Sequence, residues 1–212
     1  MSEIRVENII GETGTDAVKF TKGINATGIV TATSFSGSVA ASQLTGALPA
    51  ISGANLTGIS AGLFSSYAII THEKSNNTHG SSLSTGNFLD RELNTEVADP
   101  DGIVSISGNQ FTLQAGSYLI ESMSIIHRGN QSQSRLYNVT DSSVVQYGMS
   151  VHCSDGNSGN VLSPVVARVT IGSAKAFRIE SRVSNSDGEN SGLANNFGNT
   201  QIYTIIKIFK EN

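Results

Sequence analysis

Four histidines and one cysteine are the residues of this chain best suited to bind a metal or to act as nucleophiles. They are His72, His79, His127, His152 and Cys153. No two of these histidines have the spacing of a metal-binding pair such as HxxxH, and no cysteine cluster accompanies them. His127 and His152 are the pair that a β-sandwich can bring together, at one of its ends. The sequence therefore predicts no metal site and no cofactor.

Nucleophilic catalysis is not predicted either. His152 directly precedes Cys153, and adjacent residues of a strand point to opposite faces, which separates the imidazole from the thiol. The chain has no G-x-S-x-G elbow, and no strand-borne pair of carboxylates stands out as acid and base. A glycan depolymerase is the enzymatic alternative, but such enzymes usually need a large β-helix or a marked acidic cleft. We therefore expect a binding or structural protein and not an enzyme.

The segment Asp99-Pro100-Asp101-Gly102 places two carboxylates in one turn, and such pairs can bind calcium. It lacks the full D-x-[DN]-x-[DN]-G pattern, and Pro-Asp-Gly is an ordinary β-turn sequence. A plain β-turn is therefore favoured, with calcium binding as the alternative.

The remaining candidates for function are polar side chains in long loops rich in Asn, Ser and Gly. These loops are predicted at 73–87, 127–133, 152–160 and 184–199, and loops on a rigid scaffold often carry binding residues. The candidate receptor-contacting side chains are His79, His127, Arg128, His152, Asp155, Asp187 and Glu189. Solvated loops without a ligand are the alternative interpretation.

The elements that must position these loops are short runs of alternating apolar and polar residues between 64 and 212. Turn clusters separate the runs, and no stretch of ten residues has a helical pattern. The runs are 67–71, 103–106, 110–113, 118–126, 134–139, 144–151, 165–171, 176–183 and 202–209. This pattern predicts an all-β fold, an antiparallel jelly-roll β-sandwich.

Before the predicted sandwich, a run of 50 residues from Gly23 to His72 carries no formal charge. Single aliphatic side chains recur along it between Gly, Ser and Thr residues. One chain cannot bury so sparse a set, but several identical chains wound together can. The predicted shared core consists of Ile29, Phe35, Leu44, Leu48, Leu56 and Ile59. We therefore predict a short interwoven trimeric β stalk at 24–63, with a flexible Gly/Ser linker as the alternative.

Composition excludes several classes of function. Charged residues make up 14% of the chain and the net charge is −4, so no basic stripe is present to bind nucleic acid. No apolar stretch approaches the length of a membrane span, and residues 1–6 do not resemble the start of a signal peptide. A single cysteine allows no intrachain disulfide. Stability is therefore expected to come from packing or from oligomerisation.

The segment from Phe111 to Ile120 resembles the F-x4-G-x-Y-x-[F/I] signature of trimeric jelly rolls, the heads of complement-type collagens and of tumour-necrosis-factor-like ligands. By this resemblance Gly116 makes a tight turn between strands, while Phe111 and Ile120 face one core. Tyr118 faces either the trimer axis or the interior of the sandwich. The resemblance also implies that the last strand, 202–209, is central and often lines the three-fold axis.

Several segments of the sequence are similar to fibre and virion structural proteins of tailed phages, notably marine and cyanobacterial ones. They lie at 3–6, 28–37, 91–104, 134–141 and 166–170, so the resemblance spans most of the chain. It implies a virion protein assembled in the host cytoplasm. Tail fibres, neck appendages and capsid decorations all reuse this module.

Together these observations predict a homotrimeric virion protein of three parts. Residues 1–23 form a β tab that attaches the chain to other virion proteins, residues 24–63 the stalk, and residues 64–212 the jelly-roll head. We expect the head to bind a glycan or protein of the host surface. A capsid or neck decoration without a receptor is the alternative.

Overall fold

The computed structural model describes Thr27, residues 62–154 and residues 159–212. The chain divides into two compact units, Met1–Leu56 and Thr57–Asn212, so the structure described below belongs to the second. The predicted tab at 1–23 and nearly all of the predicted stalk at 24–63 lie outside the described residues. So do Asp155 and the predicted stalk core, Ile29, Phe35, Leu44, Leu48, Leu56 and Ile59.

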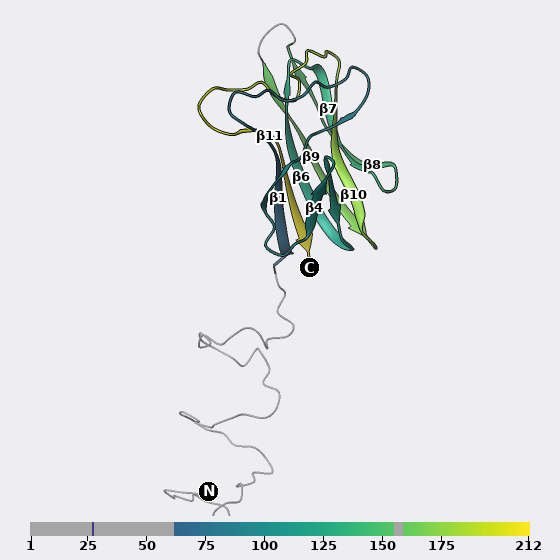
Figure 1. Cartoon of the computed structure of the whole chain (residues 1–212). Coiled ribbons are helices and arrows are strands. Elements are labelled where there is room, and N and C mark those ends of the chain that lie inside the picture. Colours follow the sequence, from purple (N-terminus) through teal and green to yellow (C-terminus); the bar gives the residue numbers. More distant parts are fainter. Residues whose placement is uncertain (1–26, 28–61, 155–158) are drawn as a thin grey trace, which may run out of the picture. The chain divides into compact units, whose positions relative to one another are not determined.

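Eleven strands form two antiparallel sheets packed face to face (Figure 1). The first sheet, sheet A, has the order β3-β1-β11-β6-β9, and the second, sheet B, has the order β4-β5-β10-β7-β8 with β2 beside β10. The strands are β1 (Phe64–Lys74), β2 (Leu89–Asp90), β3 (Thr95–Ala98), β4 (Val104–Ser107), β5 (Gln110–Leu113), β6 (Gly116–His127), β7 (Asn130–Asn138), β8 (Ser143–Cys153), β9 (Asn160–Ile171), β10 (Lys175–Val183) and β11 (Gln201–Glu211).

This architecture confirms the predicted fold class, an all-β jelly-roll sandwich. Each of the nine predicted runs coincides with a strand, although 103–106 begins one residue before β4 and 134–139 ends one residue after β7, and the structure adds two short strands, β2 and β3. The described residues contain no helix, and hence none long and apolar enough to cross a membrane. The last strand, β11, is central, between β1 and β6.

The core lies between the two sheets and follows from the strict alternation of the strands. In β6 every second residue from Tyr118 to Ile126 is buried, while the residues between them are partly exposed. Phe111 of β5 stacks on Phe177 of β10 with ring centroids 5.8 Å apart. Full burial of each such side chain contributes about 1.5–3 kcal/mol to folding.

The motif residues Phe111, Tyr118 and Ile120 all lie in this core, each at most 1% exposed. Tyr118 therefore faces the interior of the sandwich, and burial raises the pKa of its hydroxyl. That hydroxyl donates a hydrogen bond to Gln114 O at 3.0 Å. Gly116 has a positive φ of 153°, and a Cβ there would lie 3.2 Å from the Tyr118 ring. The glycine thus lets the chain turn into β6 while the ring packs against it.

The two ends of the sandwich differ. At one end the first and last strands meet, since Phe64 pairs with Glu211 and Asn212 N donates to Leu63 O. At the opposite end lie the loops 75–88 and 184–200, which follow β1 and precede β11 (Figure 1). The long loops therefore gather at the end farthest from the residues by which the chain enters the sandwich.

Two of the predicted loops are wrong in extent. The segment 127–133 is not a loop, because β6 continues to His127 and β7 begins at Asn130, which leaves a turn of two residues. At 152–160, β8 runs through Cys153 and β9 begins at Asn160. An Asn/Ser-rich composition is typical of loops, but most of these residues extend the flanking strands and take part in their cross-strand pairing.

Candidate functional site

The outer face of sheet A is unusually apolar for a surface exposed to water. Its side chains form cross-strand rows, one of which joins Tyr67, Phe209, Leu119 and Arg168 across β1, β11, β6 and β9. The row two residues further joins Ile69, Lys207, Glu121 and Val166, and the row four residues further joins Thr71, Ile205, Met123 and Pro164. The apolar members define what we call the apolar sheet face: Tyr67, Ile69, Leu119, Met123, Ile125, Leu162, Val166, Ile205 and Phe209.

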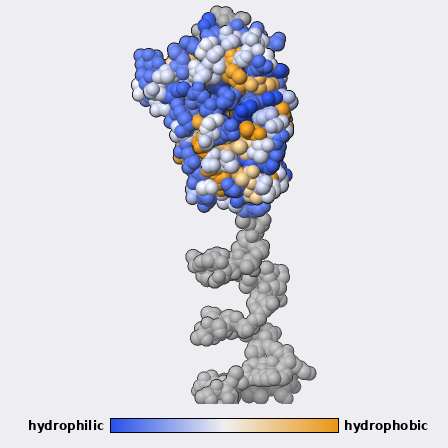
Figure 2. Space-filling view, turned by 45° about the vertical axis from the view of Figure 1, so that its right-hand side comes forward, coloured by the Kyte–Doolittle hydropathy of each residue, from blue (hydrophilic) through white to orange (hydrophobic). Residues whose placement is uncertain are grey.

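Several of these side chains are well exposed in the single chain. Tyr67 is 45% exposed, Leu162 53% and Val166 59%. Two charged pairs cross the face: Lys207 Nζ lies 3.7 Å from Glu121 Oε2, and Arg168 Nη2 lies 2.5 Å from Glu211 Oε2. Contiguous apolar surface rimmed by polar groups is typical of an interaction site. On the side of the sandwich that Figure 2 shows, apolar patches lie within a largely polar surface. The apolar sheet face is therefore a candidate self-association surface.

At the loop end, the loops 75–88 and 184–200 are joined by backbone hydrogen bonds. Gly80 N donates to Gly192 O at 2.8 Å, and Ser191 N donates to Ser81 O at 2.9 Å. Gly192 has φ +145°, and a Cβ there would lie 2.0 Å from the Tyr203 ring. These contacts hold the two loops together as one layer over the end of the sandwich.

Arg91 lies directly beneath this layer and is fully buried. Its Nη2 donates to Ser191 O at 2.9 Å and to Tyr203 O at 3.2 Å, and its Nε donates to Thr204 Oγ1 at 3.2 Å. Its Nη1 has no hydrogen-bond partner among the described residues. Burial lowers the pKa of Arg91 to about 10, against an opposing effect of Glu92, so the guanidinium stays charged at neutral pH. Arg91 thus ties the 184–200 loop to β11.

Beside Arg91 lies a second buried group, His72 of β1, which is 0% exposed. Its Nε2 is 2.8 Å from Glu92 Oε2, although without the alignment of a full hydrogen bond. Burial lowers the pKa of His72 to about 4, and Arg91 and Lys74 act in the same direction, while Glu92 opposes them. His72 is therefore neutral at physiological pH.

Glu92 is the anion of this group and lies under the 75–88 loop. Lys74 Nζ is 2.8 Å from its Oε2, and Ser81 Oγ donates to its Oε1. Burial raises the pKa of Glu92, but the hydrogen bonds from Lys74 and Ser81 and the charges around it outweigh burial and lower the pKa below its usual value. The carboxylate therefore contributes stability that is lost only in acid.

The lowered pKa of His72 predicts a stability loss between about pH 6.5 and about pH 4. In that window the unfolded chain binds a proton that the folded chain excludes, so stability falls as pH falls. A shift of this size corresponds to roughly 3 kcal/mol, most of which is lost between pH 7 and pH 4.5. We expect His72→Gln to remove most of this pH dependence in denaturant titrations at pH 7 and pH 4.5. The same loss in His72→Gln as in the unsubstituted chain would contradict the assignment, and exposed His152→Gln serves as control.

The sequence-predicted contact residues are not all at the surface. His127 is 1% exposed, and its Nδ1 is 2.8 Å from Asn160 Oδ1, so its assignment as a receptor-contacting loop residue is wrong. His152 is exposed, but it lies on β8 and not in a loop. It pairs with Gln131, whereas His127 pairs with Asn160. Cys153, the next residue, is buried.

Four other predicted contact residues, which form two pairs, lie at the loop end. His79 Nε2 is 3.6 Å from Glu189 Oε1, and Arg128 Nε is 3.9 Å from Asp187 Oδ2. His79 and Glu189 are the more exposed pair, with side chains 43% and 37% exposed. Arg91, which positions this end, was not among the predicted site residues, because a lone arginine between strands carries no sequence signal of burial.

The turn at 99–102 is accounted for by its own hydrogen bonds. The Asp99 carboxylate accepts hydrogen bonds from Ile103 N at 2.8 Å and Val104 N at 2.9 Å. Asp101 accepts from Ser66 Oγ at 2.5 Å. Within the described ranges no group of three His, Cys, Asp or Glu side chains could hold a metal ion. The geometry is that of a turn capped by its own aspartate.

No protein-family model matches the chain, and no curated protein matches it. Among solved structures it is similar to the globular domain of zebrafish complement 1qA protein, at 12% identity and a TM-score of 0.45, covering 68% of this chain and 95% of that one. It is also similar to Eiger TNF from S. frugiperda, at 11% identity and a TM-score of 0.49, covering 69% and 92%. Murine APRIL, in its pH 8.5 crystal structure, is similar at 9% identity and a TM-score of 0.44, covering 68% and 98%.

Proposed function

We propose that the chain is a homotrimeric structural protein of a tailed-phage particle and that its jelly-roll head binds the surface of the host cell. The observation that carries the self-association is the apolar sheet face. Its exposed members Tyr67, Leu162 and Val166 lie on three different rows of one sheet, and apolar side chains of β11 and β6, among them Phe209, Leu119 and Met123, lie between β1 and β9. Burial of such surface contributes about 25 cal/mol per Å².

The assignment of three copies is supported by the sequence. The segment Phe111–Ile120 resembles the signature of trimeric jelly rolls, and the central strand β11 presents Ile205, Lys207 and Phe209 on the apolar sheet face. The Lys207–Glu121 pair on that face supplies opposite charges that neighbouring copies can pair across an axis. The phage context is supported by the segments that resemble virion proteins of tailed phages, at 3–6, 28–37, 91–104, 134–141 and 166–170.

Host binding is supported by the position and chemistry of the loop end. The loops 75–88 and 184–200 lie opposite the end where β1 begins, so a head carried on its N-terminal side presents them outward. They are held together by backbone hydrogen bonds and by Arg91, so they are preorganised for binding. The proposal includes no catalytic activity.

Competition for adsorption tests this proposal. We expect the purified full-length chain to slow adsorption of the parent particle to its host, because it occupies the same surface molecules. The variant His79→Ala/Glu189→Ala should compete at least several-fold less well, since both side chains are exposed at the loop end. The pair Lys175→Ala/Asp141→Ala, an ion pair far along the sandwich, serves as matched control.

Absence of competition by the unsubstituted chain would contradict the adhesive role. If immunogold labelling then placed the chain on the capsid or neck, the decoration role would replace it. A variant that competes as well as the parent chain would remove the loop end from the binding surface.

A further inference from the structure

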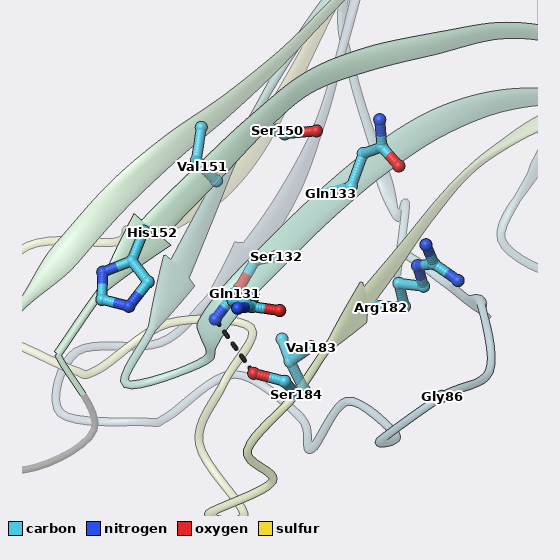
Figure 3. A pocket seen from close by; sticks show the side chains of 10 residues that line it. All are labelled: Gly86, Gln131, Ser132, Gln133, Ser150, Val151, His152, Arg182, Val183 and Ser184. Carbon is cyan, nitrogen blue, oxygen red and sulfur yellow. Dashed lines mark hydrogen bonds between the residues drawn. The ribbon is translucent and has the colours of Figure 1, made fainter.

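The outer face of sheet B carries a pocket that is distinct from both the apolar sheet face and the loop end. It has a volume of about 580 Å³, within the range of about 300–1,000 Å³ typical of small-molecule sites. Strands β7, β8 and β10 form its floor, and Gly86 lies at its rim (Figure 3). Because sheet B lies on the opposite side of the sandwich from the apolar sheet face, assembly through that face leaves the pocket open.

The floor of the pocket is a grid of polar side chains set by strand register. One row crosses the three strands as Arg182, Gln133 and Ser150. Gln131 and His152 pair in a second row, two residues further along β7 and β8. Rows in a sheet are about 6.6–6.8 Å apart and neighbouring strands about 4.8 Å.

The second row ends at Ser184, just beyond β10. Its Oγ accepts a hydrogen bond from Gln131 N at 3.0 Å (Figure 3). In the same view His152 and Arg182 stand at opposite sides of the pocket, with Gln131 between them. Gln133 Nε2 donates to Gly148 O at 3.1 Å, which fixes this amide and leaves its Oε1 as an acceptor. The grid therefore offers donors and acceptors at regular spacing, as a sugar ring does with its hydroxyls.

The charge of the pocket comes from Arg182. Two other arginines of this face, Arg135 and Arg178, both bind the Glu180 carboxylate at 2.5 Å. Arg182 forms no ion pair with any described carboxylate, and its guanidinium lies 4.9 Å from the centre of the Phe88 ring. The aromatic ring thus holds the guanidinium in place, while its donors remain available to an anion.

We infer that this pocket binds the carboxylate of an acidic sugar at the end of a surface glycan. Arg182 supplies the planar pair of donors that matches a carboxylate, and Gln131, Gln133, Ser150 and His152 supply partners for the ring hydroxyls. The inference rests on the proposed host binding for its biological meaning, although the pocket itself does not depend on the loop end.

Binding of defined oligosaccharides to the full-length chain tests the inference. The probes are matched uronic-acid, nonulosonic-acid, sulfated and neutral oligosaccharides on one array, followed by titration of any that bind. We expect binding of carboxylated probes only. Arg182→Gln should weaken it by about tenfold to a hundredfold, the range for losing a hydrogen-bonded charge, and Arg182→Lys should recover part of the loss.

Lys175→Gln, the same change of charge at the other end of β10, is the matched control and should bind as the unsubstituted chain does. Equal binding of neutral probes, binding of sulfated probes alone, or no effect of Arg182→Gln would overturn the inference. If the pocket binds acidic sugars while the chain does not compete for adsorption, the proposed host binding fails and the pocket stands. If His79→Ala/Glu189→Ala lowers adsorption and no carboxylated probe binds, the pocket fails and host binding stands.

Discussion

Replacing Arg91 with alanine is expected to lower the free energy of unfolding by about 3–5 kcal/mol, the range for breaking a buried polar network. The guanidinium fills a fully buried site and supplies three hydrogen bonds, to Ser191 O, Tyr203 O and Thr204 Oγ1. Alanine leaves these acceptors without that donor and opens a cavity beneath the loops. The carbonyl of Ser191 also loses its tie to β11, so the 184–200 loop should exchange its amide hydrogens faster.

Chemical denaturation and hydrogen exchange measure these two effects. Arg91→Met separates them, because methionine restores much of the apolar volume but none of the donors. It should recover part of the unfolding free energy and little of the loop protection. The control is Arg182→Ala, an exposed arginine that pairs with no carboxylate in the described part of the chain, which should change stability by no more than about 0.5 kcal/mol. An Arg91→Ala effect below about 1 kcal/mol would show that the buried guanidinium is not what holds the loop end.

Val166→Lys combined with Leu162→Lys is expected to abolish self-association while leaving the head folded. Both side chains are exposed on the apolar sheet face of the single chain, at 59% and 53%. Val166 lies opposite Glu121 in the β6–β9 ladder, so a lysine there gains a cross-strand partner in the monomer. In an assembled interface two added charges per copy must be desolvated, at several kcal/mol for each ion.

Sedimentation measures the loss of self-association, and circular dichroism measures whether the head remains folded. Val166→Ile, which keeps the surface apolar, should leave the assembly intact. Phe197→Lys places a charge on a side chain that is 80% exposed in the 184–200 loop and should also have no effect on assembly. Assembly that survives the double lysine variant would remove the apolar sheet face from the interface.

The fold was predictable because its strands obey simple alternation. β6 contains the whole run 118–126, and burial alternates along it residue by residue, although Ser122 and Ser124 occupy two of the buried positions. The Phe111–Ile120 motif was equally informative, since its signature residues Phe111, Tyr118 and Ile120 are all buried. β3 escaped prediction because Thr95–Ala98 contains a single large aliphatic residue and lies at the edge of its sheet. Edge strands need less apolar pattern, since they cover less of the core.

The candidate sites were much less predictable, because they depend on which residues tertiary structure brings together. His127 lies in Asn/Ser-rich sequence that suggests a loop, yet it ends a strand and is buried. Arg91 and His72 lie in different segments of the sequence, and the residues around each of them do not indicate that both lie under one loop layer. The pocket row of Arg182, Gln133 and Ser150 depends on the register of three strands, which side-chain composition does not determine.

The mass of the full-length chain in solution tests the central claim most directly. Multi-angle light scattering across a range of concentrations should give three times the chain mass of 22.2 kDa, about 67 kDa. The double lysine variant of Val166 and Leu162 should give a smaller mass under the same conditions if the apolar sheet face forms the interface. A folded chain that remains at 22.2 kDa at all concentrations would contradict the account of a trimeric head.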